Sequence, residues 1–190
     1  MTAIIGNLPF PRGKTWSDFD NAGLTLDDNT AKYLEGREYL VPDTEHNSGQ
    51  PVRLRVVKND TGSAITPGNQ LLRFSTSSVG DFGCRIAGTT NSAGMVCVPL
   101  DDAYESTPTI PDDDLFYVVM EGRCAIAIDG ANCNVTVGES VTCDNAGAIG
   151  DEAATAGQFT IGALCIAAGA SDTTETVLVD IQLKLPPEAG

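Results

Sequence analysis

The feature that most constrains the fold is a series of short apolar or alternating segments between Leu115 and Leu185. Residues 115–120 are apolar throughout, too few for a helix and rich in β-branched and aromatic types, which predicts a strand covered on both faces. A turn is expected at Glu121-Gly122, and further strands at residues 124–128, 133–137, 140–143, 159–167 and 177–185. In 133–137, Val135 and Val137 should point inward. This region predicts an antiparallel unit of six strands.

The preceding part of the chain continues the β pattern with shorter segments. Strands are expected at residues 38–41, 52–56, 71–74, 84–87 and 95–99, separated by turns rich in Gly, Asn and Ser. Residues 100–114 hold no periodic pattern and predict a boundary between two β-rich halves. We therefore expect an all-β fold, an antiparallel β-sandwich or small β-barrel, divided into residues 35–114 and 115–190 or continuous across them.

Residues 1–34 differ from the rest of the chain and predict an extended N-terminal arm. They show no alternation, and only residues 26–34 could form a short helix. Apolar side chains occur at intervals in this polar, turn-rich segment: Leu8, Phe10, Trp16, Phe19 and Leu24. The spacing suits an arm that anchors on another surface, and packing on its own domain is the equal alternative.

Charge excludes some partners. The chain of 190 residues has 26 acidic against 11 basic residues and a formal net charge of −15, so phosphate backbones and anionic lipid surfaces would repel it. No run approaches the roughly 18 to 20 apolar residues of a membrane span, and no secretory signal is recognisable at Met1. We expect synthesis in a cytosol.

The residues that commonly carry chemistry give little support for an enzyme. The six cysteines contain no Cys-x-x-Cys pair, so buried reduced thiols are expected, with disulfides or a metal site as alternatives: Cys84, Cys97, Cys124, Cys133, Cys143 and Cys165. His46, the single histidine, lies in a polar loop and is expected to be solvated. No cofactor or metal is expected.

Two charged clusters have alternative interpretations. Asp112, Asp113 and Asp114 suit a solvated or capping loop, with a calcium site or one half of a hydrolytic acid pair as alternatives. The basic cluster is expected to form salt bridges on the solvated face of a sheet, or else a docking surface for an acidic partner. Its members are Arg53, Arg55, Arg73, Arg85 and Arg123.

Two stretches of the chain resemble a known family. One is residues 51–62 followed by 65–74, and the other is residues 135–143, leading through an Ala/Gly/Thr-rich connection to 161–168 and 177–185. Their glycine-containing turns and short strands are similar to those of the head decoration, or cement, proteins of tailed bacteriophages. The resemblance covers about 60% of the chain, as estimated from these stretches and the connections that join them.

This resemblance implies a non-enzymatic virion protein that is made in the host cytoplasm and binds the outer surface of the assembled capsid. It implies the major capsid protein as partner and a homotrimer as the oligomeric state. We take Phe10, Trp16, Phe19 and Leu24 as candidate contacts with the capsid or a neighbouring protomer. Deleting residues 1–34 is then expected to abolish shell binding and leave the body folded.

A carbohydrate- or receptor-binding β-module, such as an adhesin or fibre head, is the alternative function. Exposed loop aromatics would favour such a module, but Tyr104 is the only aromatic residue in the long central loop. A hydrolase built on residues 112–114 is a third possibility.

Overall fold

The computed structural model shows a branched β-sheet with very little helix among the residues that it describes. The described residues are 4–5, 7–19, 33–74, 83–86, 97–104, 109–128, 136–138, 140–143, 148–151, 160–165 and 176–182.

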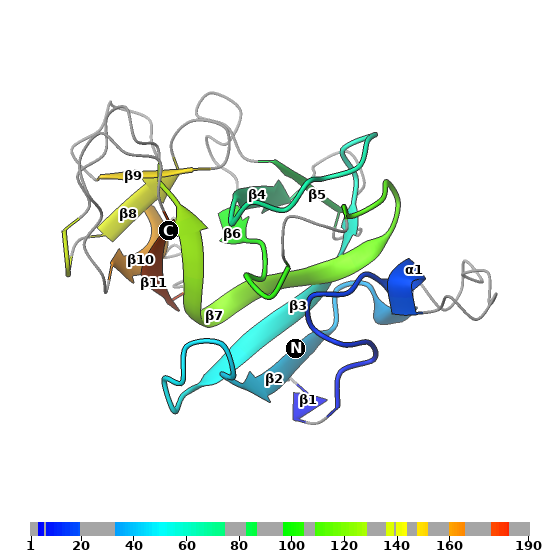
Figure 1. The fold of residues 1–190 in the computed structure, drawn as a ribbon, viewed down its shortest axis with the longest axis horizontal. Helices are drawn as coiled ribbons and strands as arrows, with labels where there is room; N and C mark the ends of the chain where they lie inside the picture. The colour runs from blue at the N-terminus through cyan, green and yellow to red at the C-terminus, as the bar shows by residue number, and fades with distance from the viewer. Residues whose placement is uncertain are drawn as a thin grey trace, which may run out of the picture.

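Two strands form the centre of the sheet. β3 (Pro51–Asn59) pairs antiparallel with β7 (Leu115–Ala127), the longest strand. On its other side, β3 pairs antiparallel with β2 (Glu38–Pro42), and β2 pairs in parallel with the two-residue β1 (Ile4–Ile5). Figure 1 shows β7 as a long bent strand that passes from the β2–β3 side of the molecule to the opposite side.

Two groups of shorter strands extend from this pair. Near the end of β3 lie β5 (Gly83–Ile86), β4 (Leu71–Phe74) and β6 (Cys97–Pro99), joined in that order. Beside the second half of β7 lie β11 (Thr176–Gln182), β10 (Thr160–Cys165), β8 (Ser140–Cys143) and β9 (Ile149–Asp151), also in that order.

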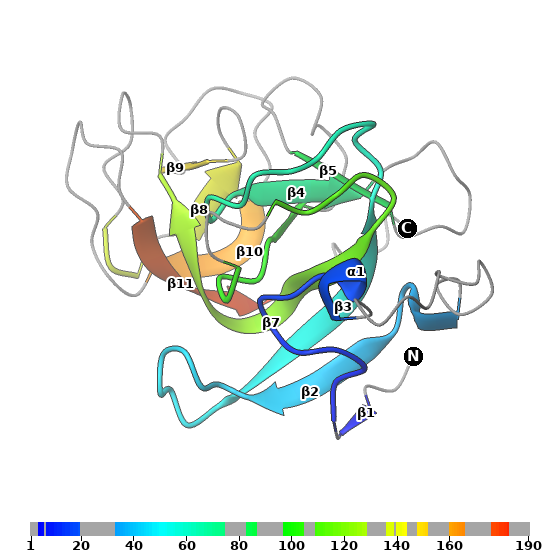
Figure 2. The ribbon, with the colours of Figure 1, turned by 45° about the vertical axis from the view of Figure 1, so that its right-hand side comes forward.

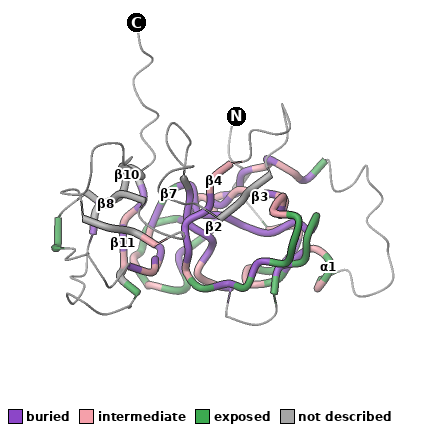
Figure 3. Tube along the Cα trace, turned by 90° about the horizontal axis from the view of Figure 1, so that it is seen from above, coloured by how far each residue is buried: buried purple, intermediate pink, exposed green. Residues whose placement is uncertain are grey.

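Burial follows the predicted side-chain patterns. Residues 115–120 of β7 are all buried, and beyond them Cys124, Ile126 and Ile128 are buried while the residues between them are half-buried. β3 alternates in the same way, with Arg53 and Arg55 half-buried between core residues. Figure 3 shows the buried segments gathered in the middle of the molecule. The coverage of both faces predicted for residues 115–120 is thus confirmed, as is the alternation predicted for residues 124–128 and for β3.

The turn predicted at Glu121-Gly122 is wrong, because β7 continues through both residues. The pairing with β3 shifts here: Arg53 lies opposite Glu121, whereas Leu54 lies opposite Val119, which leaves one extra residue in β7. Gly122 has a φ of 109°, and a Cβ atom there would lie 3.2 Å from the backbone of β3. The glycine therefore serves a β-bulge that bends the strand.

Other differences are local. β9 falls in a region predicted as a connection, and α1 (Trp16–Phe19) in a segment predicted to be extended. Val137 lies in a turn with 60% of its surface exposed, so its predicted inward position is wrong. The predicted strand residues 133–135 and most of the predicted helix at 26–34 lie outside the described residues.

The all-β class is confirmed, with mostly antiparallel pairing and almost no helix among the described residues. A sandwich-like arrangement is consistent with the structure, but the described strands form no closed barrel. The boundary predicted near residue 114 stays a prediction. No helix in the described part of the chain is both long and apolar enough to cross a membrane.

Candidate docking site

A series of aromatic rings runs from the core to the surface through the N-terminal segment, residues 7–19. The Phe10 ring stacks on Tyr117 of β7 with 4.3 Å between ring centroids. Trp16 lies 6.0 Å from Phe10, edge to face, and Phe19 lies 6.3 Å from Trp16. Phe10 and Tyr117 are 1% and 0% exposed, whereas Phe19 is 53% exposed. The series of rings therefore begins in the core and reaches solvent at Phe19. Figure 2 shows the segment between β1 and α1 that carries these rings.

Two buried tyrosines hold the backbone of this segment. The Tyr117 hydroxyl donates to the Phe10 carbonyl at 2.8 Å, and the Tyr104 hydroxyl donates to the Lys14 carbonyl at 2.7 Å. Burial raises the pKa of both phenols above the ordinary value, so both remain protonated donors at neutral pH.

An ion pair fixes the middle of the segment. Arg12 donates from Nε to Oδ2 of Asp101 at 2.9 Å and from Nη2 to Oδ1 at 2.5 Å, and the Asp101 side chain is fully buried. Burial would lower the pKa of the Arg12 guanidinium, but the hydrogen bond and charge of Asp101 outweigh this effect and raise it. Beside the pair, Gly13 has a φ of 71°, and a Cβ atom there would lie 2.4 Å from the Ala103 carbonyl oxygen. The chain can approach this closely only because residue 13 is glycine.

The helix α1 closes the segment through a second set of hydrogen bonds. Thr15 and Asp18 bond each other's backbone N–H groups, at 3.3 and 3.5 Å, in the reciprocal pattern of a capping box. The Ser17 hydroxyl and backbone N–H donate to the Asp114 carboxylate, which also accepts from the N–H of Leu115 at 2.8 Å. Asp114 therefore has the capping role predicted for its cluster.

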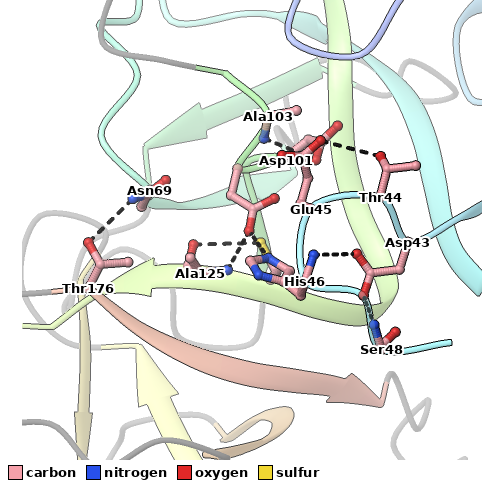
Figure 4. Close-up of polar contacts among 12 residues, drawn as sticks. Asp43, Thr44, Glu45, His46, Ser48, Asn69, Asp101, Ala103, Ala125 and Thr176 are labelled. Carbon is pink, nitrogen blue, oxygen red and sulfur yellow. Dashed lines mark hydrogen bonds and ion pairs between the residues drawn. The ribbon is translucent and has the colours of Figure 1, made fainter. Parts of the chain in front are cut away.

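His46 is not the solvated residue that its loop predicted. Its Nε2 lies 2.5 Å from Oδ2 of Asp102, and that oxygen also accepts the Ala125 N–H at 2.7 Å (Figure 4). Asp43 organises the loop by accepting from the backbone N–H groups of His46 and Ser48. Polar groups from four parts of the chain thus meet at one place: the N-terminal segment, the loop of His46, the loop after β6, and the strand β7.

This polar cluster has the properties of a structural anchor. Cys124, beside this cluster, is fully buried, and burial raises the pKa of its thiol well above the ordinary value. A nucleophilic cysteine needs the opposite shift. Among the described residues, no group of three or more His, Cys, Asp or Glu side chains is placed to hold a metal ion. Cys124 and Cys165 are buried, as predicted for the cysteines of the chain.

An apolar groove lies on the outer side of the N-terminal segment. Its volume is about 440 Å³, and it opens to solvent. The N-terminal segment and β2 line the groove together: Asn7, Leu8, Pro9, Phe10, Pro11, Phe19, Val41 and Pro42. Since Phe10 is almost fully buried and Phe19 is more than half exposed, the groove has a fixed floor and an exposed aromatic wall.

The structure separates the four predicted contact residues. Phe10 lies in the core of its own chain, which is the packing that the alternative interpretation of the arm predicted. Trp16 is half-buried, Phe19 is exposed, and Leu24 lies outside the described residues. Contact with a capsid or protomer stays a prediction for Trp16 and Phe19. Deleting residues 1–34 would uncover Tyr117, so the expectation that the body stays folded does not fit this packing.

Two members of the basic cluster form salt bridges, as the first interpretation predicted. Glu38, only 6% exposed, pairs with Arg55 and lies 3.7 Å from Arg53, which also pairs with Glu121 at 2.7 Å. Arg73 is half-buried. The sequence predicted salt bridges for this cluster without their partners, and it gave no sign of the groove, whose two walls are distant in the chain.

Comparison with known proteins gives similarity in structure but not in sequence. No protein-family model matches the chain, and no curated protein matches its sequence. A solved structure described as "head fiber gp8.5 N base in bacteriophage phi29" is similar over 68% of this chain and 94% of that chain, with 17% sequence identity and a TM-score of 0.42. A phage head fibre protein is thus a weak structural neighbour, and the similarity carries no assignment of function.

Proposed function

We propose that the chain is a structural protein of a phage virion that binds the outside of the assembled capsid as a decoration protein. Its partner in this proposal is the major capsid protein, its working form is a trimer, and it has no enzymatic activity. The observation that carries the proposal is the apolar groove with exposed Phe19, because an exposed apolar surface of this kind suits the docking of another protein.

The resemblance described above supports the same proposal. The three strands within its second stretch, β8, β10 and β11, are neighbours in the sheet. Binding through several copies of one groove would also raise the effective affinity without further contacts, since each additional site binds intramolecularly.

Co-sedimentation with undecorated shells of the same virion tests the proposal. The unmodified protein should pellet with the shells, and light scattering should give three times the chain mass of 19.8 kDa. Phe19→Ser should weaken binding by about tenfold, because covering a half-exposed phenylalanine contributes about 1 to 1.5 kcal/mol.

Val137→Ser is the matched control, since it removes another exposed apolar side chain from a turn outside the groove. Its binding should equal that of the unmodified protein. A protein that ignores shells and binds glycans would contradict the proposal and favour the carbohydrate-binding alternative.

A further inference from the structure

We propose that the groove receives one large apolar side chain carried on a basic segment of the partner protein. This inference rests on the proposed function, since it describes the chemistry by which the capsid protein would be recognised.

The lining of the groove selects an apolar occupant. Asn7 has the only polar side chain among its lining residues, and three of the others are prolines: Pro9, Pro11 and Pro42. Proline has no backbone N–H, so these walls offer few donors to a polar group. A volume of about 440 Å³ accommodates one large side chain and part of its backbone, but no folded domain.

The charges beside the groove select a basic segment. Asp18 precedes the lining residue Phe19, and Glu45 lies in the loop that follows Pro42. Arg12, next to Pro11, is the cation nearest in sequence, but its guanidinium is bonded to Asp101 and its side chain is only 11% exposed. Lys14, three residues after Pro11, is an exposed cation, but Asp18 and Glu45 outnumber it, so the charged side chains near the groove in sequence favour a basic partner overall.

The net charge of the chain disfavours a second copy as the occupant. Each copy carries a formal charge of −15, so a basic segment is favoured over a second copy in the groove, and the proposed trimer would associate through another surface. A basic partner gains from the same field, which steers its approach and strengthens at low salt.

Contacts within the chain itself hold the walls of the groove. Its floor is held by the Phe10–Tyr117 stack and its Phe19 wall by the capped helix α1. A preorganised site loses little conformational entropy on binding, so a single apolar anchor gives useful affinity.

Peptide binding tests the inference. The probe is a short fluorescein-labelled peptide with one central phenylalanine flanked by lysines, measured by fluorescence anisotropy. One control peptide has serine in place of phenylalanine, and the other has glutamates in place of the lysines. The probe should bind at least about tenfold more tightly than either control, and raising the salt concentration should weaken it.

Phe19→Ser should remove the preference for phenylalanine, while Val137→Ser should keep it. Equal binding of the glutamate peptide would overturn the charge argument, and equal binding of the serine peptide would overturn the apolar site. An unchanged preference in Phe19→Ser would place the binding elsewhere and overturn the assignment to the groove.

The shell assay separates this inference from the proposed function. If the peptides rank as expected but the protein does not pellet with shells, the proposed function fails and the groove chemistry stands. If shell binding depends on Phe19 but the peptides show no ranking, the partner chemistry is overturned and the proposed function stands.

Discussion

Replacing Arg12 by methionine should strongly destabilise the packing of the N-terminal segment. Arg12→Met keeps the aliphatic part of the side chain and removes both charge-assisted hydrogen bonds to Asp101. The Asp101 side chain is 0% exposed, and its remaining contact with a backbone donor is the Ala103 N–H at 3.4 Å. A buried carboxylate that loses its partner costs about 3 to 5 kcal/mol.

The measurement is urea unfolding followed by the fluorescence of Trp16, the only tryptophan of the chain, which lies in the same segment. Lys58→Met is the matched control, because its partner Asp113 is 76% exposed and such pairs contribute about 0 to 1 kcal/mol. The free energy of unfolding should fall by about 3 to 5 kcal/mol in Arg12→Met and by less than about 1 kcal/mol in the control.

The double variant Arg12→Met, Asp101→Leu identifies the origin of the loss. Because it removes the buried charge together with its partner, it should recover most of the stability lost in Arg12→Met. A loss below about 1 kcal/mol in Arg12→Met would refute the reasoning. A double variant less stable than the single one would show that packing, rather than the unpaired charge, sets the penalty.

Two further predictions concern the backbone and the response to acid. Gly13→Ala should destabilise the protein by at least about 1 kcal/mol more than Gly62→Ala. Both glycines have positive φ, but only at Gly13 would the added Cβ lie close to a backbone oxygen, 2.4 Å from that of Ala103. Equal losses of stability in urea unfolding would contradict this close approach. Burial would raise the pKa of Asp43, but hydrogen bonds from Ser48 and from the His46 and Ser48 N–H groups lower it below the ordinary 3.8. The stability contributed by the ionised carboxylate is therefore complete above about pH 5 and falls as the pH drops through and below 3.8. The stability difference between the unmodified protein and Asp43→Asn should shrink below about pH 4, and a difference independent of pH would contradict this.

The sequence correctly predicted the strands in which buried residues recur at every second position. In β3 and the second half of β7, core-facing and solvent-facing residues alternate, and this local pattern is visible without knowledge of the partner strands. The bulge at Gly122 could not be distinguished from a turn in this way. Both features use glycine at positive φ, and only the pairing with β3 and β11 on either side shows that the strand continues.

The site depended on contacts that no local pattern contains. The spacing of aromatic residues in the N-terminal segment correctly suggested anchoring at intervals, but Phe10 and its partner Tyr117 are 107 positions apart. The sequence therefore left open which surface receives the anchors. His46 was misjudged for the same reason, because Asp102 is 56 positions away.

The continuity of the rings from Tyr117 to Phe19 links the stability of the N-terminal segment to docking. The groove exists only while the N-terminal segment is packed on the sheet. A partner that binds the groove therefore stabilises the packed segment, and its apparent affinity depends on the fraction of molecules in which the segment is packed. In Arg12→Met, the fraction of molecules with a packed segment falls only if the segment can detach from the sheet while the rest of the protein stays folded. A weaker affinity for the lysine-flanked peptide, with the rest of the sheet still folded in hydrogen exchange, would show that the segment opens independently. An unchanged affinity at lower global stability would show that the segment and the β3–β7 core unfold as one cooperative unit, which the sharing of Phe10 between them favours.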